Sequence, residues 1–356
     1  MNFQQRSVER RNDRFAPTAT LQPAKTMWKR IVSRYEKPSL CRSVWQAAST
    51  VVSYGVLWYL MHQSVAISYW ITLALAILAA GFLVRLFIIF HDCGHGSFFK
   101  SRRANDTLGV ITGILTFTPY YQWRHKHAIH HATSGDLDRR GTGDVWTMTV
   151  REYLDASRWR RFAYRLTRNP VVLFGIAPLL LLGVGQRFPW RKADRRERTN
   201  VLWTNLAILG MAALLAWLMG LQAYLVIQVT VLMIAGSVGV WLFYVQHQFE
   251  GAYWERRNQW DYVTAAIQGS SFYKLPRVLQ WFTGNIGFHH IHHLSPGIPN
   301  YNLEKCHKAE PLFQDVERVT LLSSLKSLTY RLWDEQRQKW VGYGHVRALR
   351  RGRPTG

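Results

Sequence analysis

Long apolar runs with almost no charged residues constrain this chain more than any other feature. They cover roughly Ser43–Met61, Val65–Phe90, Val201–Met219 and Leu221–Gln246, and the second contains a single charge, Arg85. A helix of about 20 apolar residues spans the hydrocarbon core of a bilayer, which is about 30 Å thick. A buried core helix would explain one such run, but not two close pairs. The sequence therefore predicts an all-α integral membrane protein with four transmembrane helices in two hairpins.

Positive charges lie between the hairpins and at both ends of the chain. The sequence holds 45 Lys and Arg against 21 Asp and Glu, a net charge of +24. The hairpin turns at 62–64 and 220 have no Lys or Arg, whereas 1–43, 100–169, 189–199 and the C-terminal third are basic. Cytoplasmic loops of membrane proteins are enriched in Lys and Arg. We therefore expect both termini and the basic segments on the cytoplasmic face.

Two further apolar runs, 107–123 and 170–188, do not fit as simple crossings. One crossing would put the basic segments on opposite sides, and a third hairpin would export the Arg-rich segment 124–169. Interfacial or re-entrant helices avoid both problems.

The expected domain organisation follows from these assignments. It comprises a basic cytoplasmic N-terminal segment (1–42), a membrane domain with a cytoplasmic cap (43–310) and a basic cytoplasmic C-terminal segment (311–356). The chain start has no signal-peptide pattern, and we favour a bacterial plasma membrane over the endoplasmic reticulum.

Several classes of protein are excluded by what the sequence lacks. Three Cys without a repeated spacing exclude a disulfide scaffold and a Cys-only zinc or iron–sulfur module. No phosphate-binding or dinucleotide-binding glycine motif occurs. The basic run Arg187–Arg198 lies beside a predicted membrane helix, so we interpret it as an anchor for anionic lipid headgroups. No nucleic-acid partner is expected.

The histidines are concentrated in three clusters. HDCGH at 91–95 places histidines at i and i+4, while HAIHH at 127–131 and HHIHH at 289–293 place them at i, i+3 and i+4. On a helix these positions share one face, so each cluster can direct two or three imidazoles at a common point. Imidazole binds iron, zinc, copper and nickel. Because eight nitrogens exceed the need of one ion, two ions sharing the set is the simplest interpretation.

His247 is a candidate ninth ligand because of its predicted depth. A core crossing of about 20 residues ends near Val84 in the second helix and near Val240 in the fourth. His91 and His247 each follow seven residues later, about 10 Å above the core at 1.5 Å per residue. The alternative is an exposed histidine at the membrane interface.

Around these clusters the sequence resembles the integral-membrane fatty acid desaturases, over about residues 40 to 310. The resemblance rests on HDCGHGSFF at 91–99, WRHKHAIHHAT at 123–133 and NIGFHHIHH at 285–293. The HDCGH form is most similar to the acyl-lipid type, which acts at the Δ12 (omega-6) or omega-3 position. The resemblance implies insertion of a cis double bond into a membrane lipid acyl chain. It also implies O2, a di-iron centre of two iron ions, and a ferredoxin or cytochrome b5-like electron donor.

The resemblance also assigns the metal ligands, residue by residue. The nine ligands that it implies are His91, His95, His127, His130, His131, His247, His289, His292 and His293. No catalytic residue beyond these ligands is expected.

Other polar residues near the motifs receive weaker assignments. Candidates for orienting an imidazole through its second ring nitrogen are Asp92, Asp144, Asn285, Asp136 and Asp138. His125 and His290 fall at variable motif positions, so we expect them to be exposed or to support a ligand. Cys93 lies between two of these ligands, and we expect a buried spacer there. The ExxH pattern at 304–307 receives no metal role, because soluble di-iron bundles use two such patterns and a second is missing.

Two other classes of protein remain open at this point. A related histidine-rich hydroxylase or ketolase, acting on alkanes, carotenoids or sphingolipids, would share the metal and the fold but add an oxygen atom. A metal transporter would place histidines at mid-membrane depth, and the apolar runs here are almost free of histidine. The mass of the product distinguishes the first alternative, and metal content with O2 consumption distinguishes the second.

Overall fold

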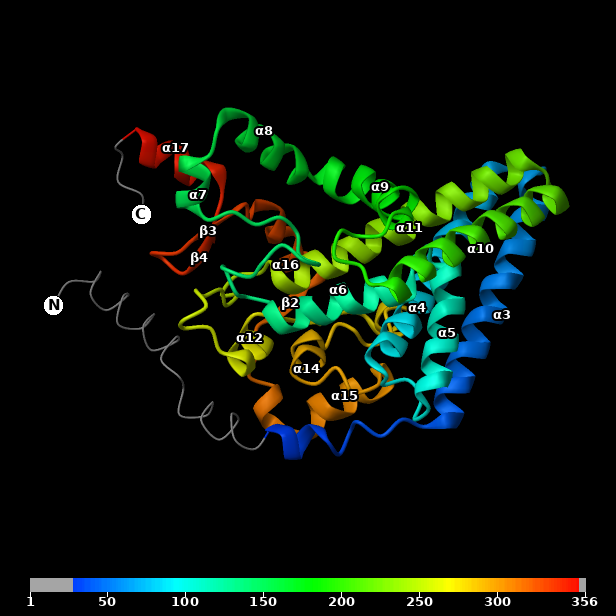
Figure 1. Ribbon diagram of the computed structural model, residues 1–356, viewed down its shortest axis with the longest axis horizontal. Helices are drawn as coiled ribbons and strands as arrows, with labels where there is room; N and C mark the ends of the chain where they lie inside the picture. Colours follow the sequence, from blue (N-terminus) through cyan, green and yellow to red (C-terminus); the bar gives the residue numbers. More distant parts are fainter. Residues whose placement is uncertain (1–27, 352–356) are drawn as a thin grey trace.

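Two long helical hairpins form one end of the molecule in the computed structural model, which describes residues 28–351 (Figure 1). The first joins α3 (Leu40–Val65) to α4 (Tyr69–His95), and the second joins α10 (Arg195–Met219) to α11 (Leu221–His247). Gly220 makes the second turn with a φ of 87°, a value that glycine adopts without steric cost. Residues 1–27 lie outside the described residues. They include most of the predicted N-terminal segment and the chain start, where no signal peptide is expected.

The hairpins expose large apolar side chains that a bilayer would cover. Trp203 and Trp217 on α10 are 64% and 80% exposed, and Trp45 on α3 is 75% exposed. Helix α11 packs between α4 and α10, and its Ile227 and Val231 are fully buried. Exposed apolar surface on this scale marks a membrane-contacting face.

Three helices, α4, α10 and α11, are long and apolar enough to cross a membrane. A fourth candidate is a bent pair, in which α8 (Arg158–Thr167) meets the segment Val171–Arg187 at 60°. Helix α3 is not among the candidates, because its inward stripe is polar and includes Ser43, Gln46 and Thr50. The prediction of a mostly helical membrane protein is confirmed.

Both shorter apolar runs are broken in the structure. The run 107–123 divides into α5 (Arg102–Leu115) and α6 (Tyr120–Thr133), with a turn at 116–119 in which Phe117 has a φ of 56°. The run 170–188 becomes the π-helix η1 (Val171–Ile176), α9 (Ala177–Gly183) and the 3₁₀-helix η2 (Gly185–Arg187). Neither run forms a continuous helix of membrane-spanning length.

A cap of short elements covers one end of the hairpins (Figure 1). Its helical elements are α7 (Val150–Asp155), α12 (Tyr262–Gln268), α13 (Arg277–Phe282), α14 (His289–Leu294), α15 (Asn300–Ala309), η3 (Pro311–Phe313), α16 (Leu321–Ser324), η4 (Leu325–Thr329) and α17 (Tyr343–Arg350). Strand β1 (Phe272–Lys274) pairs in parallel with β2 (Arg318–Thr320), and β3 (Leu332–Asp334) pairs antiparallel with β4 (Lys339–Val341). The segment from 311 onward is therefore packed into the cap through β2, β3 and β4.

Hydrogen bonds tie the first turns of α3 and α10 to segments that follow the first histidine cluster. Ser43 Oγ, near the start of α3, donates to the carbonyl oxygen of Phe98, just beyond the end of α4 (2.6 Å). Near the start of α10, Glu197 Oε1 lies 2.6 Å from Nδ1 of His125 on α6. Both hairpins thus begin and end on the side of the histidine clusters, and their turns lie at the far end.

Candidate metal centre

The histidine clusters occupy helix ends and short helices that converge beneath the cap. His91 and His95 lie in the last turn and a half of α4, and His247 is the last residue of α11. The second cluster lies on α6 and the third forms most of α14. The i, i+3, i+4 spacing therefore does place the imidazoles of each cluster on one helix face, as the sequence predicts.

Five histidines from all three clusters form the larger group. Their ligand nitrogens lie within 4.8 Å of one another, and the members are His91, His95, His127, His131 and His292. The Nε2 atom of His131 lies 3.1 Å from that of His127 and 3.0 Å from that of His292. Two imidazole nitrogens bound at right angles to one ion, at about 2.1 Å each, are about 3.0 Å apart. The spacing fits a shared metal ion.

The remaining histidines form a smaller group beside the first. The ligand nitrogens of His130, His247 and His293 lie within 4.8 Å of one another. Nε2 of His289 is 3.0 Å from Nε2 of His247, which in turn is 3.3 Å from Nε2 of His130. All nine histidines singled out from the sequence are thus brought together, divided five and four. His247 belongs to the smaller group, and the group of five forms from the three clusters alone.

The chemical state of these side chains suits a metal. Burial lowers the pKa well below the usual range for His127, His131, His289, His292 and His293, so the imidazoles are neutral at pH 7, as metal ligation requires. Nε2 of His95 and Nε2 of His293 are buried without a hydrogen-bond partner. Unpartnered buried nitrogens are costly in a purely structural cluster, whereas a metal ion would satisfy them.

Other groups fix the orientation of three of the nine rings. Nδ1 of His91 lies 3.2 Å from Asp92 Oδ1, and Nδ1 of His130 lies 2.7 Å from Asp144 Oδ1. His247 Nδ1 lies 3.2 Å from the carbonyl oxygen of Gly269. A proton held on Nδ1 by such an acceptor leaves Nε2 free for a metal. Asp92 and Asp144 therefore each contact a candidate ligand, and their orienting role stays a prediction.

Asn285 is connected to His91 through two intermediate residues, Asn300 and Asp92. Its Nδ2 donates to the carbonyl oxygen of Asn300 (3.1 Å), and its Oδ1 accepts a hydrogen bond from Gln280 (2.8 Å). Asn300 in turn donates to Asp92 Oδ2 from its backbone N–H (2.7 Å) and from Nδ2 (2.9 Å). Sequence reasoning missed Asn300, because no motif or spacing connects it to a histidine 209 positions earlier.

Several residues near the motifs stay outside both groups. His125 is exposed and contacts Glu197, while His290 is fully buried and lies 3.1 Å, through Nε2, from the carbonyl oxygen of Phe313. The backbone N–H groups of 138 and 139 donate to Asp136, which thus holds a turn. Asp138 pairs with Arg256 (2.6 Å). His307 belongs to neither histidine group.

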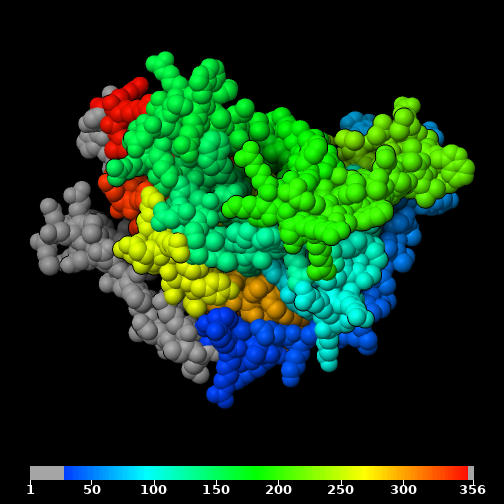
Figure 2. Space-filling model, in the orientation of Figure 1, coloured from blue at the N-terminus to red at the C-terminus, as the bar shows by residue number. Residues whose placement is uncertain are grey.

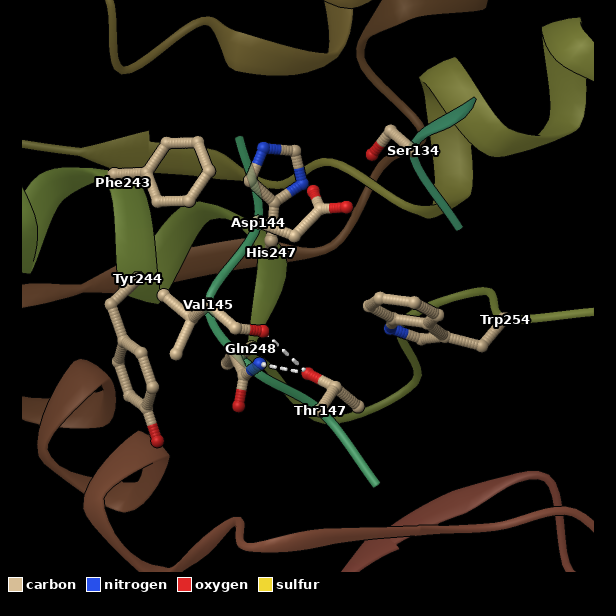
Figure 3. A pocket seen from close by; sticks show the side chains of 9 residues that line it. All are labelled: Ser134, Asp144, Val145, Thr147, Phe243, Tyr244, His247, Gln248 and Trp254. Carbon is tan, nitrogen blue, oxygen red and sulfur yellow. Dashed lines mark hydrogen bonds between the residues drawn. The ribbon is translucent and has the colours of Figure 1, made fainter. Parts of the chain in front are cut away.

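A small pocket opens beside the smaller group (Figure 3). It is lined by Ser134, Asp144, Val145, Thr147, Phe243, Tyr244, His247, Gln248 and Trp254. Thr147 Oγ1 donates to the carbonyl oxygen of Val145 (3.0 Å), and Gln248 Nε2 donates to Thr147 Oγ1 (3.4 Å).

Behind this pocket lies a buried cation. Arg168 is 1% exposed and donates from Nη1 to Gln248 Oε1 (2.8 Å) and from Nη2 to Thr147 Oγ1 (3.2 Å). No carboxylate pairs with it among residues 28–351. Its charge is stabilised instead by the rings of Tyr164, Tyr244 and Trp340, whose centroids lie 5.5–5.9 Å from Cζ.

Comparison with known proteins identifies the family. The fatty acid desaturase family model matches residues 67–320. The chain is 50% identical over 318 residues to a fatty acid desaturase of Bacillus subtilis (strain 168), covering 89% of this chain and 90% of that protein. It is 30% identical over 287 residues to an sn-1 oleoyl-lipid 12-desaturase of Anabaena variabilis, covering 74% of each.

A third relative shares a shorter region. The chain is 29% identical over 236 residues to an sn-1 acyl-lipid omega-3 desaturase (ferredoxin) of Nostoc sp. (strain 36), covering 63% of each. Together with the convergent histidine groups and the apolar helices, these matches show that the chain belongs to the fatty acid desaturase family, a class of O2-dependent oxidoreductases.

Proposed function

We propose that this membrane desaturase inserts a cis double bond into the acyl chain of a membrane glycerolipid, using two iron ions held by the nine histidines. The observation that carries the proposal is the division of these side chains into adjacent groups of five and four. Neutral imidazoles leave bound ions strongly cationic, in contrast to the carboxylate-rich sites of soluble di-iron bundles.

The metal would supply chemistry that side chains lack. When bound, iron and O2 supply an oxidant strong enough to remove two hydrogens from adjacent methylenes, which acid–base groups cannot do. One O2, two electrons and two protons are consumed, and one double bond and two waters are formed. The protein itself orients the ligands through Asp92, Asp144 and the carbonyl oxygen of Gly269.

Aromatic side chains protect the histidines from water. The Trp123 ring stacks on His127, with centroids 4.3 Å apart. The Phe243 ring lies 5.0 Å from the His130 ring and 5.2 Å from the His247 ring. We infer that these rings exclude water from the groups and support productive use of O2.

The contacts of the hairpins favour four membrane crossings by α3, α4, α10 and α11. The 2.6 Å contact between His125 and Glu197 joins α6 to the start of α10, so both lie on one side of the membrane. A crossing by the bent pair between them would separate these residues by a bilayer. Ser43 contacts Phe98 across the first hairpin, which supports a full crossing by α3.

The bent pair is better placed in the plane of the interface. On α8, Trp159 is 81% and Phe162 58% exposed, and the helix carries four Arg, at 158, 160, 161 and 165. Exposed aromatic and basic side chains on one short helix suit the headgroup region of an anionic membrane. The cap and both termini would then lie on the cytoplasmic face. The relative from Bacillus subtilis supports a bacterial membrane.

Relatives support the substrate class and the donor. Proteins named acyl-lipid omega-3 desaturase (ferredoxin) and oleoyl-lipid 12-desaturase match this chain. We infer a glycerolipid acyl chain as substrate, a position at Δ12/omega-6 or omega-3, and a ferredoxin-type donor.

The test is expression in a host of known lipid composition, followed by mass spectrometry of double-bond positions. A new lipid lighter by two hydrogens is expected, with His127→Ala as the inactive control. A product heavier by one oxygen would instead identify a hydroxylase. A new bond away from Δ12 and omega-3 would reject the proposed position and keep the reaction.

A further inference from the structure

The side of helix α6 that faces away from the histidine groups is exposed to solvent. His125, Ala128 and Ala132 lie at i, i+3 and i+7, so they share one helix face, and all three are exposed. The histidines of the second cluster occupy the opposite side. A helix with its side chains is about 10 Å across. A molecule resting on the two alanines would therefore approach the group of five to about one helix diameter.

Three cations without acidic partners lie along one edge of this face. Backbone N–H of Trp190 donates to Gln122 Oε1 (2.8 Å), and the Trp190 ring lies 5.1 Å from the ring of His125. The exposed cations that follow are Arg191, Lys192 and Arg195, and none forms an ion pair within the described part of the chain. Figure 2 shows the blue-green surface of α6 beside the green segment that leads into α10.

The side chains of this segment differ from those of the interfacial helix α8. Helix α8 combines Arg with exposed Trp159 and Phe162, whereas no large apolar side chain is exposed between Phe188 and Leu202. A cationic surface without apolar side chains binds a charged partner in water better than it inserts between headgroups. Because the neighbouring alanines have small side chains, a partner can approach the backbone of α6, and thus the group of five, closely.

We propose that the exposed face of α6 (His125, Ala128 and Ala132), together with Arg191, Lys192 and Arg195, docks a small acidic iron–sulfur protein that delivers electrons. These six residues are called the α6 surface below. The inference rests on the proposed function, in which each double bond consumes two electrons, two protons and one O2. An iron–sulfur protein of the ferredoxin type delivers one electron at a time, so two reduced donors are oxidised per turnover.

The exchange of donors explains the character of the surface. The first donor must leave before the second can bind, so a tight apolar interface would slow turnover. Electron-transfer partners typically form small, weak interfaces, and opposite charge then raises the rate of encounter. Three unpaired cations at the edge of a small-residue face meet both requirements.

The test combines three charge reversals, Arg191→Glu, Lys192→Glu and Arg195→Glu, in one full-length variant. Desaturation by the iron-loaded enzyme is measured in lipid nanodiscs with reduced ferredoxin as the probe. We expect the KM for ferredoxin to rise at least about tenfold and its salt dependence to be lost. Ala128→Glu, which places a carboxylate at the centre of the face, should raise the same KM several-fold with iron content unchanged.

The matched control reverses three charges elsewhere. Arg347, Arg350 and Arg351 are exposed, and they lie on or just after α17, far from α6 (Figure 1). Their combined replacement by Glu changes the net charge equally and should leave the KM for ferredoxin unchanged. A single turnover, started by adding O2 to chemically reduced enzyme, should give the same product yield in every variant.

Each other outcome has a defined meaning. An unchanged KM and salt dependence in the α6-surface variant would overturn the proposal. So would an unchanged KM with lost binding to phosphatidylglycerol vesicles, which would identify a lipid contact. Product after chemical reduction but with no ferredoxin would reject the donor class. No product from the wild-type enzyme even after chemical reduction would reject the proposed function instead.

Discussion

Asn300 donates two hydrogen bonds to one carboxylate oxygen of Asp92, from its backbone N–H (2.7 Å) and from Nδ2 (2.9 Å). The other oxygen of Asp92 faces Nδ1 of His91 at 3.2 Å. The start of α15 therefore orients a histidine at the end of α4.

Asn300→Ala should weaken metal binding, because Asp92 would lose a donor and hold His91 less firmly. Loss of such an outer hydrogen bond costs about 10–100-fold in metal affinity, measured by iron titration of the purified protein. Asn302→Ala is the control on the same helix, since its amide donates to the carbonyl oxygen of Tyr35 (2.9 Å). Equal iron affinity in the two variants would contradict the role of Asn300.

Asp144→Asn should act on the smaller histidine group. The amide cannot hold the proton of His130 Nδ1 as the carboxylate does at 2.7 Å, so metal affinity should fall by about 10–100-fold. Asp138→Asn should leave iron content unchanged, because that exposed carboxylate pairs with Arg256. Identical iron retention by both variants during dialysis against a chelator would count against this assignment.

His247→Ala and His247→Gln should reduce iron from two ions per chain towards one and abolish most product formation. The smaller group then loses the member whose Nε2 lies 3.0 Å from His289 and 3.3 Å from His130. His125→Ala is the matched control for iron content, because its ring is exposed and outside both groups. Full iron and normal turnover in both His247 variants would show that His247 is no ligand.

His290→Ala should separate stability from metal binding. The change would leave a cavity in place of the buried ring and remove one hydrogen bond to the carbonyl oxygen of Phe313, a cost of about 2–4 kcal/mol. Iron per folded chain should stay at the wild-type value while the thermal unfolding midpoint falls. Loss of iron without loss of stability would place His290 among the ligands.

Sidedness can be measured with single cysteines in a Cys41→Ser background, since Cys93 and Cys306 are buried. Gln222 follows the Gly220 turn, and Asn258 lies in the cap; both are exposed. In intact cells an impermeant maleimide should label Gln222→Cys but label Asn258→Cys only after permeabilisation. Labelling of both in intact cells would contradict four crossings with a cytoplasmic cap.

The sequence predicted that the histidines would come together, because helical spacing and depth are local properties, and their role as ligands stays a prediction. His91 and His247 follow from counting residues along apolar helices, and the three clusters follow from a spacing of three and four. Which imidazoles meet in each group could not be predicted, because the path of α6 between α4 and α11 decides it. The position of His290 could not be predicted from local spacing either. Its ring is fully buried and contacts Phe313, and no local pattern connects these two residues.

The parts of the fold that depend on distant pairing could not be predicted. The parallel pairing of β1 with β2 joins residues 272–274 to 318–320 through a three-residue strand at each side, too short to show alternation. The break between α5 and α6 was hidden because apolar residues continue through it to Trp123. The turn there depends on Phe117 and Pro119, and the run of apolar residues alone favours one helix.

Arg168 connects the end of α11 to residues that are translated much later. Its guanidinium holds Gln248, the neighbour of His247, and it is covered in part by Trp340. When the ribosome has added His293, every candidate ligand exists, yet the ring that shelters this cation is still 47 residues away (340 minus 293). A buried cation with part of its cover missing is costly, so we expect the residues that follow α11 to settle only after β4 has folded. Metal loading of the histidine groups would then be complete only once the chain has been made in full.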